Sequence, residues 1–518
     1  MKKYHMLITI VFIIPMVYTI VYAIIPSTGA IYTHDSIAYT YGAKTWLEGK
    51  GMLYFGYKTP IIQWPPLYIL WMTIPIRLGM EPALFVRLMN PLLHVLLVIV
   101  LAKWLCKHMH HKWMVYVGVV LVTFSIPMLH VMRFIWTEPV FIVLFVMACV
   151  CFHNYVVGHQ LKWLMIAAIL SALCWLTRYM GVTLLMTCTI YMLCLEQPIR
   201  KKVGHVFLYG TIASMPMVIW VMRNLFISHT FTGSRGIHKI PLLTNIRKSL
   251  HILYVWFAPG DSANGWVVLL IIVITIAVAF CVKRCWRNGH KSHSSMGAML
   301  ILFIGLYSAI LLFIASHYAM DPLNDRMWVP IYMPVIWLLL IVVDQLFDHD
   351  AMLSVGRLGS WCVTLSMVVT IFINVYQMTH YIKHKDEFHE AKEGYRFYGE
   401  ESAMIPYIQD MGLGKDDVIM TNNPALLTFN TSIDCRWTPK RRSIALYEYP
   451  AIMGSIHGKQ VYIAWFGKPD HATFYTVDEL KHYHTIKAVK TFHEGSIYKI
   501  DKTHLTMNRL EQNRLKGR

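Results

Sequence analysis

Long apolar runs alternate with short polar segments from the N-terminus to about residue 378, and most approach the roughly 20 residues that cross a bilayer as a helix. The first run contains Pro15 and no clear cleavage pattern follows it, so we expect a retained helix rather than a signal peptide. Three prolines interrupt the apolar segment between Gln63 and Leu78, which indicates a re-entrant or interfacial piece. The pattern predicts a mainly α, polytopic bundle of about eleven spans, near 6–25, 83–105, 113–130, 138–157, 163–177, 179–195, 205–226, 265–282, 297–318, 328–347 and 357–378.

The stretch from Trp163 to Leu195 is either one very long helix or two short helices separated at Arg178. With two helices, the basic clusters at 2–3, 103–112, 200–202 and 283–291 all face the cytoplasm, as the positive-inside rule expects. We therefore predict two helices, an extracytoplasmic C-terminal region, and one site at the outer face, although loops also carry charges without any function. The charged residues placed at that face are Asp35, Glu138, Arg178, Arg223, Arg235, Asp321, Asp325 and Arg326.

The pattern changes after residue 385, where short strand-like runs such as Asp417–Met420 and Val461–Trp465 alternate with helix-like runs. Thr476 and Glu479 form a capping-box pattern that opens a predicted helix through His484. We predict a transmembrane domain over 1–380 with external loop helices at 34–60, a small soluble α/β domain over 385–502, and a basic tail over 503–518.

Composition supports a cell-membrane protein, because 56% of the residues are hydrophobic and 14% are charged. The net charge of +19 largely flanks the apolar runs, so we expect membrane lipids and no nucleic acid as partners. The ten cysteines show neither a disulfide framework nor a zinc spacing. His380 and His384 lie one helical turn apart, but chance spacing explains them better than a metal site in a chain with 26 histidines.

The first polar loop holds the residues that point to chemistry. Asp35 opens a segment in which Ala38, Tyr39, Gly42, Ala43, Trp46 and Leu47 recur at helical spacing, which predicts a helix at the membrane surface. A carboxylate near lipid is costly and is a candidate functional group. The alternative is that Asp35 only caps this helix.

The order of motifs resembles the GT-C superfamily of membrane glycosyltransferases, in particular the bacterial branch of protein O-mannosyltransferases and lipid A aminoarabinose transferases. Over roughly residues 1–345 the corresponding positions are Asp35, Tyr39, Ala43 and Gly49, then Pro65–Tyr68, Arg87–Asn90, Glu138–Phe141, Thr177–Gly181, Arg223–Asn224, Gly233–Arg235 and Asp321–Pro330. One departure is that Ser36, rather than a glutamate, follows Asp35, so the acceptor class of protein mannosyltransferases does not carry over.

The resemblance implies transfer of a sugar from a polyprenyl-phosphate donor to a lipid, glycan or protein acceptor. Such a reaction needs a base for the acceptor hydroxyl and cations for the departing phosphate. Asp35 is the predicted base or metal ligand, the metal being a divalent cation such as Mg²⁺ or Mn²⁺. Glu138 is a predicted second catalytic acid, or alternatively a charge that satisfies a helix N-terminus. The predicted phosphate ligands are Arg223, Arg235 and Arg326, and the predicted substrate-binding residues are Tyr39, Pro65, Pro66, Tyr68 and Arg178.

Two other readings stay open. A transporter or a flippase for lipid-linked sugars favours charges near the bilayer midplane and broken helices in two repeated halves, and no such repeat is visible. A ligase or polymerase of surface polysaccharide with a diphosphate-linked donor is still glycosyl transfer, and the sequence excludes it poorly. Arg178 likewise has an alternative role, as a purely structural partner for a carboxylate instead of a substrate-binding residue.

Overall fold

The computed structural model describes residues 14–25, 29–55, 59–233, 240–256, 292–318, 320–347, 375–376, 379, 402–414, 417–431, 433, 435–438, 460–467, 475–481 and 484–503. The chain divides into two compact units. The first unit contains residues 1–31 and 62–388, and the second contains residues 32–61 and 389–518. The segment 32–61, predicted to belong with the spans, is thus grouped with the C-terminal region.

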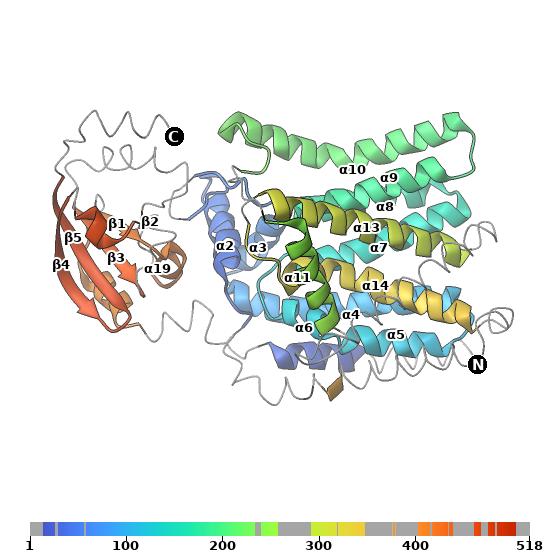
Figure 1. Ribbon diagram of the computed structural model, residues 1–518, viewed down its shortest axis with the longest axis horizontal. Coiled ribbons are helices and arrows are strands. Elements are labelled where there is room, and N and C mark those ends of the chain that lie inside the picture. Colours follow the sequence, from blue (N-terminus) through green and yellow to red (C-terminus); the bar gives the residue numbers. More distant parts are fainter. Residues whose placement is uncertain are drawn as a thin grey trace. The chain divides into compact units, whose positions relative to one another are not determined.

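The first unit is a bundle of apolar helices (Figure 1). A short helix, Ile14–Ile24, comes first among the described residues. The others are α3 (Leu67–Arg77), α4 (Pro82–His108), α5 (Trp113–Thr123), α6 (Ile126–Met132), α7 (Glu138–Gly158), α8 (Leu161–Thr177), the 3₁₀ turn η1 (Tyr179–Gly181), α9 (Val182–Cys194), α10 (Ile199–Ser228), α11 (Leu242–Val255), α13 (Ser292–His317) and α14 (Asp325–Leu346).

Among the described residues, α4, α7, α10, α13 and α14 are long and apolar enough to cross a membrane. The pair α5 and α6, bent by 47°, is either a broken span or a re-entrant loop. The protein is thus a multi-pass membrane protein. The predicted span 265–282 lies outside the described residues, and 357–378 lies almost wholly outside them. The interrupted segment near Gln63 forms the short helix α3, whose first turn follows Pro66.

The prediction of two helices between Trp163 and Leu195 is confirmed. Helix α8 ends at Thr177, Arg178 is extended, and η1 leads into α9. The turn is tight, because a Cβ on Gly181 would lie 2.5 Å from the Cα of Trp175. The two helices therefore meet through a sharp turn that places Arg178 directly beyond the end of α8.

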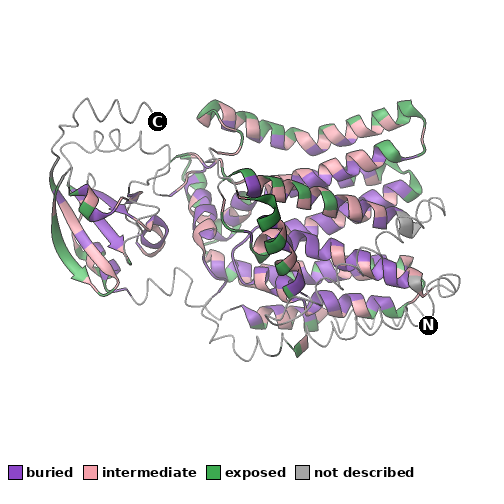
Figure 2. Ribbon diagram, in the orientation of Figure 1, coloured by how far each residue is buried: buried purple, intermediate pink, exposed green. Residues whose placement is uncertain are grey.

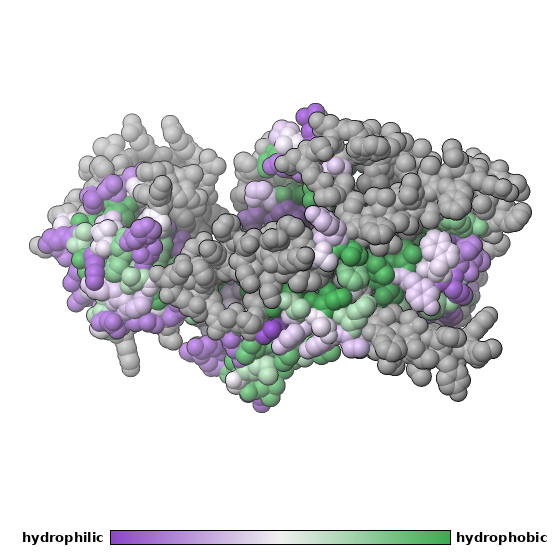
Figure 3. Space-filling model, turned by 90° about the horizontal axis from the view of Figure 1, so that it is seen from below, coloured by the Kyte–Doolittle hydropathy of each residue, from purple (hydrophilic) through white to green (hydrophobic). Residues whose placement is uncertain are grey.

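Burial within the bundle separates central from peripheral helices. Figure 2 shows α7 and α14 mostly buried, whereas α10 exposes a long apolar face that includes Phe207 and Phe226. Hydrophobic residues also gather on the described bundle surface visible in Figure 3. In a membrane such apolar faces contact lipid, and the internally paired backbone of a helix leaves no polar group for the lipid to satisfy.

The two ends of the bundle differ in chemistry. We call one the Glu138 end, where α7 and α14 begin and α8 and α10 finish. At the opposite end the buried Asp344 accepts hydrogen bonds from the backbone N–H groups of His110 (2.9 Å) and His111 (2.8 Å). Both imidazole Nδ1 atoms also contact this carboxylate, at 3.2 and 3.1 Å. Asp344 thereby fixes the turn between α4 and α5 to the end of α14.

The second unit is built on a five-stranded sheet in the order β2-β1-β3-β5-β4 (Figure 1). The strands are β1 (Val418–Thr421), β2 (Cys435–Trp437), β3 (Val461–Phe466), β4 (His484–Phe492) and β5 (Gly495–Thr503). β1 pairs in parallel with β2 and β3, and β5 pairs antiparallel with β3 and β4. The two strands predicted from sequence, β1 and β3, are confirmed and lie side by side.

Helices cover both faces of the sheet, which explains why its central strands are continuously apolar. Val418 and Met420 pack on one face with α21 (Val477–Leu480). Ile419 packs on the other with α18 (Met404–Asp410) and α19 (Pro424–Asn430). The capping box of Thr476 and Glu479 is present, but the predicted helix through His484 is too long. The chain leaves the helix after Leu480, because β4 starts at His484 and pairs with β5.

The segment 32–61 forms α2 (His34–Leu47) and a loop that folds back on it. The N–H of Ile61 donates to the carbonyl of Met52, and the N–H of Leu53 donates to Thr45 Oγ1. The helix cap is Thr33, in a reciprocal capping box with Ser36. The alternative that Asp35 caps this helix is therefore wrong, since Asp35 lies inside the first turn.

Candidate functional site

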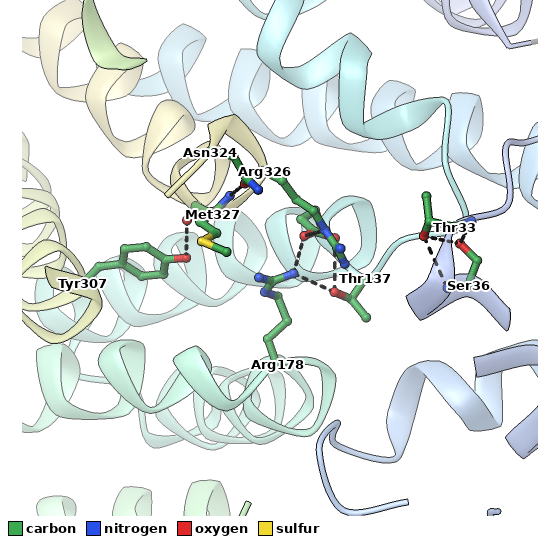
Figure 4. Close-up of polar contacts among 9 residues, drawn as sticks. Thr33, Ser36, Thr137, Arg178, Tyr307, Asn324, Arg326 and Met327 are labelled. Atoms are coloured by element: carbon green, nitrogen blue, oxygen red, sulfur yellow. Dashed lines mark hydrogen bonds and ion pairs between the residues drawn. The ribbon is translucent and has the colours of Figure 1, made fainter. Parts of the chain in front are cut away.

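A buried carboxylate joins three helices at the Glu138 end. The Glu138 side chain is 0% exposed and forms ion pairs with Arg178 and Arg326, which are 18% and 21% exposed. Arg326 Nε donates to Glu138 Oε1 at 2.6 Å, and Thr137 Oγ1 donates to Oε2 at 3.2 Å. Arg178 also donates to Thr137 Oγ1 at 2.8 Å (Figure 4). We call Glu138, Arg178 and Arg326 the arginine triad.

The local sequence explains how each member reaches the triad. Glu138 starts α7 just before Pro139, which is favoured in the first turn of a helix because its missing N–H needs no partner there. Arg178 follows the last residue of α8. Arg326 is in the first turn of α14, whose N-cap Asn324 accepts from the N–H of Met327 (Figure 4).

The charges of the triad sum to +1, since one carboxylate faces two guanidinium groups. Burying the carboxylate alone is costly, and two cations with a hydroxyl donor compensate that cost. A guanidinium has five N–H donors, so an arginine can hold a carboxylate and an anionic ligand together. Arg326 is further fixed by the ring of Trp136, whose centroid lies 4.2 Å from its Cζ. The arrangement suits a singly charged anion at this end.

A second polar cluster surrounds the residue next to Arg178. Tyr179 Oη donates to the carbonyl of Ile62 at 2.7 Å and accepts from Trp220 Nε1 at 3.1 Å and Asn224 Nδ2 at 3.3 Å. Arg223 stacks on the Trp220 ring, with 4.3 Å between Cζ and the ring centroid, and donates to Asn224 Oδ1 at 3.0 Å. Arg223 is therefore held in a defined position at the end of α10.

The structure brings some predicted site residues together. Glu138, Arg178 and Arg326 are in direct contact, and Arg223 contacts the cluster around Tyr179. Pro65 is buried, Pro66 is the N-cap of α3, and Tyr68 is buried on α3. Asp35 and Tyr39 lie on α2 in the second unit, with Asp35 half-buried and Tyr39 buried. Arg235 lies outside the described residues.

Residues beside the charged groups orient the arginines and were not predicted as site residues. Thr137 and Trp136 precede Glu138 directly, and Tyr179 follows Arg178 directly. A hydroxyl or an aromatic ring beside a charged residue at a helix end is a weak signal, although aromatic faces are common partners of guanidinium groups. Trp220 gave no signal, because its position on an apolar helix is typical of a lipid-facing or core residue.

The predicted metal site is not tested by this geometry. Among the described residues there is no group of three or more histidine, cysteine, aspartate or glutamate side chains arranged to hold a metal ion. His380 and His384 lie outside those residues.

Comparisons with known proteins fit this architecture. The family described as dolichyl-phosphate-mannose-protein mannosyltransferase matches residues 63–220, which include Glu138 and Arg178. Crystal structures of ArnT from Cupriavidus metallidurans align over 96% of this chain and 98% of theirs at 10% identity, with TM-scores of 0.60 for the apo state and 0.56 for the form bound to undecaprenyl phosphate. This chain has the GT-C fold.

The GT-C fold also accounts for a third similarity. The mycobacterial arabinofuranosyltransferase AftD aligns over 94% of this chain with a TM-score of 0.54 at 12% identity. The alignment spans 41% of the AftD chain. No curated protein sequence matches this chain. The chain therefore resembles GT-C glycosyltransferases in its fold and carries a family match over its central helices.

Proposed function

We propose that this protein is a GT-C glycosyltransferase that moves a sugar from a polyprenyl-phosphate donor to an acceptor at the extracytoplasmic face. The observation that carries the proposal is the arginine triad. A buried glutamate holds two arginines at one end of a bundle with the GT-C fold, and one positive charge remains for an anion. The solved structure of ArnT with undecaprenyl phosphate shows that a protein of this fold binds such a lipid phosphate.

The residues divide the reaction between them. We assign Arg326 and Arg178 to the donor phosphate, because guanidinium groups bind phosphate oxygens bidentately and stabilise the charge that grows as the phosphate leaves. Arg223 is a further phosphate ligand in this proposal. Glu138 acts by orienting Arg178 and Arg326, a positioning role beside the catalytic role that the sequence predicted.

Asp35 is the proposed base for the acceptor hydroxyl. A single displacement, in which the acceptor oxygen bonds to the anomeric carbon while the phosphate leaves, inverts the configuration at that carbon. Asp35 is half-buried in the first turn of α2, and its carboxylate can accept the proton of an acceptor hydroxyl. The alternative role of Asp35 in this proposal is that of a ligand to a divalent cation.

The test uses purified protein in nanodiscs with undecaprenyl phosphate carrying mannose, glucose or 4-aminoarabinose, and a cell-envelope fraction as acceptor. The wild type should release undecaprenyl phosphate from one of these donors. Asp35→Asn should abolish release without loss of folded protein, and Arg326→Gln should weaken binding of undecaprenyl phosphate at least tenfold. Arg200→Gln, an exposed arginine at the other end of α10, is the matched control and should change neither.

Other outcomes are decisive as well. Full release by Asp35→Asn contradicts the proposed base. If no donor is consumed but one crosses the bilayer of a proteoliposome intact, the protein is a flippase and the transferase proposal fails.

A further inference from the structure

The helix that carries Asp35 is packed on the C-terminal α/β domain. The ring of Tyr32, which precedes α2, lies 4.4 Å from the ring of Phe429 on α19. The ring of His34, the residue before Asp35, lies 6.0 Å from the ring of Trp437 at the end of β2. The segment 32–61 and residues 389–518 form one compact unit.

The partners of these rings are themselves fixed. Trp437 belongs to the hydrophobic core of the sheet, and the next residue donates its N–H to the carbonyl of Thr421. Phe429 is near the C-terminal end of α19, a helix capped by Asn423. On the other side, His34 Nε2 lies 3.0 Å from Tyr54 Oη and its ring packs against Phe55. The residues on both sides of Thr33, the N-cap of α2, are thus held by aromatic contacts.

We propose that the C-terminal α/β domain positions the base, with Phe429 and Trp437 as positioning residues for Asp35. The proposal rests on the proposed function, because it takes Asp35 as the base. The two contacts flank the N-cap Thr33 directly before Asp35, so they set where the first turn of α2, and the carboxylate within it, lies.

The position of Asp35 depends on how helix α2 is held. A 14-residue helix is marginally stable in water, so α2 depends on the surfaces it packs against. A general base needs hydrogen-bond reach of the proton it removes, and a displacement of about 1 Å can lower turnover on the order of 100-fold. Losing the contact with Phe429 should therefore lower kcat, while donor binding through the arginines should persist.

The experiment compares full-length variants in nanodiscs. Phe429→Ala and Tyr32→Leu remove the same contact from its two sides, and Phe429→Tyr keeps an aromatic ring. The matched control is Phe492→Ala, which removes another half-buried aromatic pair of the domain, between Phe492 and Tyr407 at 5.5 Å. The measurements are amide hydrogen exchange of residues 36–47, and kcat and KM for the undecaprenyl-phosphate sugar that the wild type consumes.

Phe429→Ala and Tyr32→Leu should raise the exchange rate in α2 at least tenfold and lower kcat 10- to 100-fold, with KM within twofold. Phe429→Tyr should keep kcat at the wild-type value. Phe492→Ala should change neither the exchange rate of α2 nor kcat. Unchanged exchange, unchanged kcat, or an equal loss in Phe492→Ala would each overturn the positioning role. A wild type that consumes no donor overturns the proposed function and this inference together, whereas active Phe429→Ala overturns the inference alone.

Discussion

Replacing Glu138 by glutamine isolates the electrostatic role of the triad, because the substitution keeps the shape and removes one charge. The wild-type triad carries one negative and two positive charges. In Glu138→Gln, Arg178 and Arg326 face each other without a counterion, and both donate toward a neutral amide. We expect a less stable protein whose arginines separate and no longer present a joint anion site.

The size of the effect can be worked out from the geometry. Two unit charges about 4 Å apart attract by roughly 4 kcal/mol at an effective dielectric constant of about 20, and Glu138 makes two such pairs. Hydration regained by the arginines offsets part of the loss, since their side chains are 18% and 21% exposed. Breaking a buried ion pair costs about 3–5 kcal/mol. We therefore expect Glu138→Gln to lower the free energy of unfolding by about 3 kcal/mol, toward the lower end of that range.

The assay is an unfolding titration in mixed micelles, run beside binding of undecaprenyl phosphate. The double variant Glu138→Gln with Arg178→Gln removes one charge of each sign, so it should lose less stability than Glu138→Gln alone. A Glu138→Gln protein within about 0.5 kcal/mol of wild type, the usual range of surface substitutions, refutes this reasoning. The reasoning is also refuted if the double variant loses as much stability as Glu138→Gln and Arg178→Gln lose together as single variants.

Three further predictions concern other parts of the chain. Asp344→Asn should cost about 2 kcal/mol in the same titration, because an amide cannot accept all the hydrogen bonds from His110 and His111. Gly181→Ala should lower the yield of folded protein, measured by size-exclusion chromatography, since its Cβ would meet the backbone of α8. Burial raises the pKa of Glu494, but hydrogen bonds from its own backbone, Met404 and Ser402 outweigh burial and hold the pKa below its ordinary value. This stabilisation is complete above the unfolded pKa of about 4.3 and is lost as pH falls through the folded pKa. Between neutral pH and acid, the free energy of unfolding should therefore fall more for the wild type than for Glu494→Gln.

Much of the bundle was predictable from the sequence, because the bilayer imposes length and polarity on each span. The break at Arg178 followed from the distribution of basic clusters, and the structure confirms it. The pairing of Arg178 with a carboxylate was one of two open readings. The pairing of Arg326 with the same carboxylate could not be predicted from the sequence. Arg326 and Glu138 are far apart in the chain, and only the packing of α14 against α7 brings them together.

In the second unit, some elements could be predicted from the sequence and others could not. The central strands were readable because both faces of the sheet are buried and each strand is continuously apolar. The end of the helix after Thr476 could not be predicted from the local sequence, because pairing between β4 and β5 decides where this helix stops. No local pattern connects Tyr32 with Phe429, so the grouping of the first loop with the C-terminal domain came from tertiary contacts alone.

The contact between Tyr32 and Phe429 also bears on how the protein is made. Nearly 400 residues separate the two rings in the chain, and ribosomes add roughly 5–20 residues per second. The first loop therefore waits on the order of half a minute for its partner surface to be synthesised. A chain that ends before Phe429 lacks the surface against which Tyr32 and α2 pack. Synthesis of α19 and β2 is then the step that supplies the packing surface of α2.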